Sequence, residues 1–230
     1  MRALVVVALL LLGLSALLDR VAVRVAEDRV ATELAAKGDL RGAPQVDIAG
    51  FPFLTQAIGG SYDDVRISLT AAELGQPEGT RADLALRGVH VPLSAALSGS
   101  VGKVPVDRID GTATLSYSLL SAELGEGTQL APEGDRLRIT RTVEILGRQL
   151  RLTAVGQVTL EGGDLVVDVQ EAAGAGVEVP GFLLDRAVDQ LDLRYPVPAL
   201  PFGLQVASVR PAADGVDVGL EAVDTVLTAE

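Results

Sequence analysis

The sequence of 230 residues contains no cysteine and only one histidine, His90. Without cysteine the chain has no disulfide, no thiolate nucleophile, no Cys-ligated zinc and no lipid anchor attached through cysteine. A Ser-His-Asp hydrolase would have to use His90 as its base. This residue lies in an alternating run just before Pro92, where a structural histidine is the simpler interpretation. The pattern G-x-S-x-G is also absent, so the sequence predicts a protein that is not an enzyme.

The sequence also lacks a complete phosphate loop or metal-binding motif. Gly102-Lys103 resembles the end of a phosphate loop, but Leu97 stands where the first glycine is required and Val104 where Ser or Thr is required. The closely spaced carboxylates occur in turn-like segments without a histidine nearby; they are Asp63, Asp64, Asp107 and Asp110. We therefore expect no metal and no cofactor.

Positive charge is scarce, because 19 Lys and Arg face 31 Asp and Glu and the net charge is −12. A nucleic acid is an unfavourable partner for such a chain, since binding phosphate backbones requires Lys and Arg. The same charge opposes electrostatic adsorption to anionic lipid. Any affinity for lipid must therefore come from apolar burial or from a few placed arginines.

The N-terminus carries an apolar run from Ala3 to Leu18 that contains no charged residue. As a helix it would span roughly 24 Å, which is short of the ~30 Å hydrocarbon core of a bilayer. Residues 1–18 therefore fit a secretory signal peptide, and an uncleaved signal anchor fits equally well because no clear cleavage site follows. A buried core helix is a third interpretation. Residues 19–230 are predicted to form a single domain outside the cytoplasm.

The segment Asp19–Lys37 has the period of an amphipathic helix, with Gly38 as its stop. Its predicted apolar face consists of Val23, Ala26, Val30 and Leu34. Shorter helices are expected at 51–58, 118–124 and 180–191. A helix packed on a sheet is favoured over a helix lying on a membrane, because the polar face is mixed rather than basic.

Most of the remaining chain alternates between apolar and polar residues, as in Val65-Arg66-Ile67-Ser68-Leu69. Gly-containing turns separate pairs of such runs, for example at 161–164 and 213–215, which predicts antiparallel hairpins. Roughly eight or nine strands result, with few helices between them. The fold class is therefore predicted to be α+β, with a curved antiparallel sheet.

The seven aromatic residues are concentrated outside the alternating strands. They either plug the ends of the sheet or line the mouth of an apolar cavity. On the second interpretation the predicted lipid-binding residues are Phe51, Phe53, Leu54, Ile58, Tyr62, Phe182, Leu183, Tyr195 and Phe202. Arg186 and Arg194 are candidate donors to a phosphate headgroup, and the alternative for each is a surface ion pair.

Two motifs, Gly50–Gln56 (GFPFLTQ) and Pro198–Leu204 (PALPFGL), are specific enough to suggest a family. Together with Gly60, Tyr62 and Asp110–Ala113, they resemble the LmeA-like phospholipid-binding proteins of actinobacterial cell envelopes. The likeness covers about residues 20–222. It implies a tubular lipid-binding fold, with an elongated, barrel-like sheet wrapped along a long N-terminal helix.

The resemblance also implies a periplasmic protein at the inner membrane that binds phospholipids, phosphoinositides among them, and supports assembly of lipomannan-type envelope glycolipids. The leading hypothesis is a lipid-binding or lipid-transfer protein that holds acyl chains in an apolar cavity. The alternative is a non-catalytic scaffold of the cell envelope, which would have a filled core.

We predict that the run from Ala3 to Leu18 directs export of everything that follows it, because the run is apolar and close to the N-terminus. A reporter fused after Glu230 that works only outside the cytoplasm should therefore be active. Activity of a cytoplasm-only reporter at the same position would contradict export.

Overall fold

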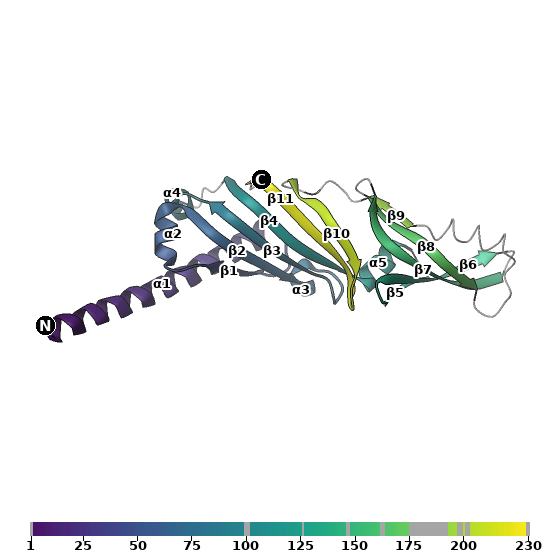
Figure 1. Cartoon of the computed structure of the whole chain (residues 1–230), viewed down its shortest axis with the longest axis horizontal. Coiled ribbons are helices and arrows are strands. Elements are labelled where there is room, and N and C mark those ends of the chain that lie inside the picture. The colour runs from purple at the N-terminus through teal and green to yellow at the C-terminus, as the bar shows by residue number, and fades with distance from the viewer. Residues whose placement is uncertain are drawn as a thin grey trace. The chain divides into compact units, whose positions relative to one another are not determined.

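The structure is a computed structural model that describes residues 2–98, 102–125, 127–145, 148–161, 164–174, 193–196, 200 and 203–228 (Figure 1). The chain forms two compact units. Unit 1 comprises Met1–Leu69, Asp83–Gly111 and Ala222–Glu230, and unit 2 comprises Thr70–Ala82 and Thr112–Glu221.

The described residues form five helices and eleven strands. The helices are α1 (Arg2–Lys37), α2 (Phe53–Gly59), α3 (Ala71–Leu74), α4 (Leu93–Ser98) and α5 (Tyr117–Glu123). The strands are β1 (Gln45–Ala49), β2 (Ser61–Thr70), β3 (Arg81–His90), β4 (Lys103–Ser116), β5 (Thr128–Glu133), β6 (Arg136–Ile145), β7 (Arg148–Glu161), β8 (Asp164–Gly174), β9 (Leu193–Pro196), β10 (Gln205–Pro211) and β11 (Gly215–Thr228).

The strands belong to two antiparallel sheets. One has the order β1-β2-β3-β4-β11-β10 and the other the order β5-β6-β7-β8-β9.

The predicted α+β class, antiparallel pairing and long N-terminal helix are confirmed. The expectation of one barrel-like sheet is wrong, because the described strands divide into two sheets, neither of which closes on itself. Two of the short predicted helices are confirmed as α2 and α5, and the third, at 180–191, lies outside the described residues.

Helix α1 runs without interruption through the apolar run and the amphipathic segment. It ends at Lys37, as predicted, and the amide of Gly38 donates to the Leu34 carbonyl at 2.8 Å. Its buried residues are Asp19, Val23 and Ala31. The prediction that Val30 lies on the packed face of α1 is wrong, because Val30 is exposed and Ala31, the next residue, is buried in its place.

The apolar run of α1 is not a core helix. None of the side chains from residue 3 to residue 18 is buried, and Leu4, Leu10 and Leu12 are among the most exposed apolar residues of the described chain. By length and composition the helix could cross a membrane. The structure therefore leaves the signal peptide and the membrane anchor as interpretations of this run and excludes the buried helix.

The second half of α1 covers the edge strand of unit 1. Val46 and Ile48 of β1 are buried, and the amide of Ile48 donates to the Glu27 Oε1 atom of α1 at 2.9 Å. This bond satisfies a backbone donor that an edge strand would otherwise present to solvent.

The buried carboxylate of Asp19 holds the N-terminus of α2 against α1. Its Oδ1 atom accepts a hydrogen bond from the Leu54 amide at 2.9 Å, and its Oδ2 atom accepts one from Arg20 at 2.9 Å. The N-cap residue of α2 is Pro52, which provides no side-chain acceptor, so Asp19 supplies the cap from a different helix. Burial alone would raise the pKa of Asp19, but the hydrogen bonds from Leu54, Arg20 and Phe53 outweigh it and lower the pKa below its ordinary value.

We predict that the contribution of Asp19 to stability is lost in acid. Since its pKa is lower in the folded than in the unfolded chain, the carboxylate stabilises the fold above the ordinary pKa, and this stabilisation disappears as the pH falls through the folded-state pKa. In full-length protein in mild detergent, Asp19→Asn should therefore have a lower free energy of unfolding than the parent at pH 7, and the difference should shrink below about pH 4.

Asp28→Asn is the matched control, since it removes one exposed carboxylate from the same helix. A difference between Asp19→Asn and the parent that stays constant between pH 7 and pH 3 would contradict the prediction.

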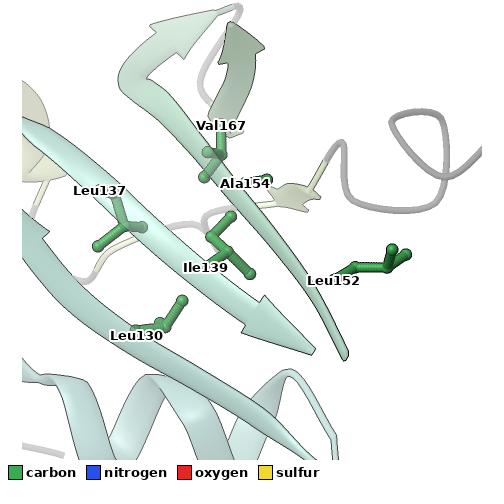
Figure 2. Close-up of a cluster of buried hydrophobic side chains, with 6 residues drawn as sticks. All are labelled: Leu130, Leu137, Ile139, Leu152, Ala154 and Val167. Carbon is green, nitrogen blue, oxygen red and sulfur yellow. The ribbon is translucent and has the colours of Figure 1, made fainter. Parts of the chain in front are cut away.

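Unit 2 contains a core formed by one face of the second sheet (Figure 2). Its buried members are Leu130 of β5, Leu137 and Ile139 of β6, Leu152 and Ala154 of β7, and Val167 of β8. The alternation predicted for β6 is confirmed, because its buried positions, 137 and 139, are two residues apart. Helix α5 packs against this cluster through Leu120 and Leu124.

Candidate lipid-binding site

Unit 2 contains an open, largely apolar cavity of about 490 Å³. Strands from both sheets contribute to its walls, as do α3 and α5. Its apolar lining consists of Leu74, Ala82, Ala113, Leu115, Leu119, Leu120, Leu124, Leu130, Leu137, Val158, Val167 and Val216. Four polar residues complete it, namely Gln76, Thr80, Arg81 and Glu123. The largely apolar lining can hold a hydrocarbon chain.

A set of hydrogen bonds fixes α5 beside this cavity. The Oγ atom of Ser116 caps α5 by accepting from the Leu119 amide at 3.2 Å, and it also accepts from the buried Thr80 hydroxyl at 3.0 Å. The hydroxyl of Tyr117 donates to the Ala212 carbonyl at 2.8 Å. Burial raises the pKa of Tyr117, so this hydroxyl remains a donor over the physiological range.

Strand β11 lies very close to β4 in the segment that leads into α5. A Cβ atom on Gly215 would lie 2.1 Å from the Leu115 carbonyl oxygen, so this position requires glycine. The hydroxyl of Thr114 donates to Asp217 at 2.7 Å and joins the same two strands. These contacts place Leu115 and Val216 in one wall of the cavity.

A second, more polar groove of about 460 Å³ lies on the opposite face of α5. Helical spacing separates the two faces, because Tyr117, Ser118 and Ser121 line the groove whereas Leu119, Leu120, Glu123 and Leu124 line the cavity. The rest of the groove consists of Thr128, Gln129, Leu130, Ala131, Arg138 and Thr140. Leu130 contributes to both.

Arg138 is the cationic group of this groove. Its Nε atom donates to Glu133 at 2.9 Å, and this hydrogen bond lowers the pKa of Glu133 and raises that of Arg138. The buried Thr128 hydroxyl has no hydrogen-bond partner within the described chain. A guanidinium group together with hydroxyls can bind a phosphate.

Five of the residues predicted from sequence to bind lipid lie in unit 1. In unit 1, Phe53 and Tyr62 are buried and face each other with ring centroids 6.0 Å apart, whereas Phe51, Leu54 and Ile58 are exposed. In β9, Tyr195 pairs with Leu165 and Arg194 with Val166. Phe182, Leu183, Arg186 and Phe202 lie outside the described residues. Of the predicted residues whose side chains the structure describes, none lines the cavity or the groove. The contact of all the predicted residues with lipid stays a prediction.

The single histidine pairs with an acidic side chain at the surface. The Nε2 atom of His90 lies 3.1 Å from the Oδ1 atom of Asp107, and both side chains are exposed. The expectation that the acidic pairs occupy turns is wrong, because Asp63 and Asp64 lie in β2 and Asp107 and Asp110 in β4. Within the described ranges, no three His, Asp or Glu residues are placed to hold a metal ion.

Sequence reasoning missed the cavity because its walls come from segments far apart in the chain, such as Leu74 and Val216. One local signal was available. Thr70 and Glu73 form a capping box, and this T-x-x-E pattern marks the start of α3, which carries Leu74 into the cavity wall.

Comparison with known proteins gives one family match. The model of the LmeA-like phospholipid-binding family matches residues 17–221, which include the α1–α2 junction and all of unit 2. No curated protein and no solved structure matches the chain. The matching family is one of lipid-binding proteins and not a known enzyme family. Because the match covers nearly the whole sequence, the chain belongs to the LmeA-like phospholipid-binding family.

Proposed function

We propose that this protein binds a phospholipid outside the cytoplasm, with an acyl chain in the cavity of unit 2 and the headgroup in the neighbouring groove. The observation that carries the proposal is the apolar cavity itself. Its volume of about 490 Å³ falls within the roughly 300–1,000 Å³ that ligand sites commonly occupy.

Hydrocarbon burial would supply the affinity. Each methylene group removed from water contributes about 0.8 kcal/mol. The cavity lining is contributed largely by Leu, Val and Ala, so an acyl chain loses no hydrogen bond on entering it. A net charge of −12 leaves such burial as the main source of lipid affinity for this chain.

The polar groove on the other face of α5 suits the headgroup of the phospholipid. Arg138 can donate hydrogen bonds to a phosphate, and the hydroxyls of Ser118, Ser121 and Thr140 line the same groove. Since Leu130 borders both sites, the boundary between chain and headgroup would lie near this residue.

The proposed setting is the periplasm or cell envelope, with the inner membrane reached through residues 3–18 or by lipid exchange. There the protein would carry phospholipid, phosphoinositides among its ligands, in support of lipomannan-type glycolipid assembly. The scaffold alternative predicts a filled interior, and the cavity of unit 2 favours the lipid-carrying function instead.

We predict that filling the cavity weakens lipid binding without unfolding the protein. Ala82 of β3 lines the cavity, and Ala82→Phe would displace about two methylene groups of the ligand, which corresponds to an affinity roughly tenfold lower. The measurement is native mass spectrometry of the full-length chain released from detergent, scored by the fraction that retains a phospholipid.

Ala85→Phe is the matched control, because position 85 lies on the opposite face of the same strand. Equal lipid retention by the two variants would place the ligand outside this cavity. A parent chain that retains no phospholipid would favour the scaffold function.

We predict that Arg138→Gln selectively reduces the retention of anionic phospholipids. The substitution removes the charge-assisted hydrogen bond to phosphate and leaves the cavity unchanged. In the same experiment with phosphatidylinositol, retention should fall several-fold relative to Arg151→Gln, which removes an exposed arginine of β7 outside the groove. Equal losses for the two variants would mean that the headgroup does not bind at Arg138.

A further inference from the structure

Unit 1 displays five exposed apolar side chains on and beside the helices α2 and α4. They are Phe51, Leu54, Ile58, Leu93 and Leu97, and we call them the apolar patch. Ile58, Leu97 and Phe51 are 75%, 69% and 68% exposed. Unpartnered apolar side chains gathered in this way mark a surface that contacts a protein or a membrane.

The patch is one continuous surface because its two helices touch. Helix α2 contacts α4, and the amide of Val91, just before α4, donates to the Gly60 carbonyl at the end of α2 at 2.9 Å (Figure 1). Core packing does not account for the exposed residues. Phe53 and Ala57 already fill the interior, so α2 is apolar on its outer face as well.

The patch lies beside the point at which the apolar run of α1 ends. Asp19 is the first charged residue after that run, and it binds the Leu54 amide. The guanidinium of Arg20 lies over the Phe51 ring, 5.3 Å from its centroid. If residues 3–18 lie in a bilayer, residues 19 and 20 lie at its surface. Their contacts then hold Leu54 and Phe51 at the same depth, at the bilayer surface.

The charge distribution fits a lipid surface. Neither residues 50–62 nor residues 91–98 contain Asp, Glu, Lys or Arg, although the whole chain has a net charge of −12. Acidic side chains in these segments would be repelled by anionic headgroups and costly to desolvate. The segments that form the patch are therefore free of the charge that excludes the rest of the protein from a membrane.

We infer that the apolar patch inserts into the surface of the lipid bilayer that holds residues 3–18 of α1. Its side chains enter the boundary between headgroups and acyl chains, roughly 5–10 Å deep, as amphipathic surface helices do. Phe51 and Arg20 suit this level, since aromatic rings favour the interface and an arginine can extend its charged end towards water. This inference does not rest on the proposed cavity ligand.

The test uses the absence of tryptophan from the sequence. Single tryptophans replace Phe51, Ile58 or Leu97 in the full-length chain, which is reconstituted into vesicles of phosphatidylcholine with brominated acyl chains. Ala36→Trp is the control, because it is exposed on the same helix α1 but lies 17 residues beyond Asp19, about 25 Å along the helix. Circular dichroism and thermal melting establish that each variant is folded.

We expect the bromolipid to quench Ile58→Trp and Leu97→Trp several-fold more strongly than Ala36→Trp. Quenching at the patch no stronger than at position 36 would overturn the inference. Cross-linking of two chains through cysteines placed at Ile58 and Leu97, without bromolipid quenching, would likewise overturn it and identify the patch as a contact between copies of this chain. Neither outcome depends on Ala82, so the cavity proposal is tested separately.

Discussion

The buried carboxylate of Asp19 is the interaction on which the arrangement of unit 1 depends. A buried charge must be paired, and this one is satisfied by Arg20 and by the exposed amide end of α2. Because Pro52 offers α2 no side-chain cap, the same contact completes the helix. It also fixes the place where the apolar run leaves the folded unit. One carboxylate therefore couples the membrane-directed helix to the segment that carries Phe51, Leu54 and Ile58.

Hydroxyl groups make the hydrogen bonds that position α5 in unit 2. Ser116, Thr80 and Tyr117 connect α5 to its surroundings through hydrogen bonds of 2.8–3.2 Å. An apolar cavity leaves side chains without the dispersion contacts that a filled core would give them. The hydrogen bonds hold the helix in place despite that loss. The cavity therefore remains in the described structure as space that a hydrocarbon chain can fill.

The sequence predicted local structure better than assembly. The period of two along β6, the antiparallel pairing within the predicted hairpins, and the short helices α2 and α5 all follow from neighbouring residues, and the structure confirms them. Val30 was assigned to the wrong side of α1 because an average helical period cannot decide between adjacent residues when Ala31 is also apolar. The division into two sheets was missed because alternation shows which residues share a face but not which strands pair.

The sequence by itself determined the apolar N-terminal run, the α+β class, the scarcity of catalytic and metal-binding side chains, and the family, since each depends on composition, period or a short motif. The tertiary structure decided the surroundings of chemically similar residues. Phe51 and Phe53 are two positions apart and identical in chemistry, yet one is exposed and the other packs on Tyr62. The cavity lining likewise contains Leu74 and Val216, which are far apart in the sequence. Only the path of the backbone through space brings such distant segments together, so no local pattern could have identified them.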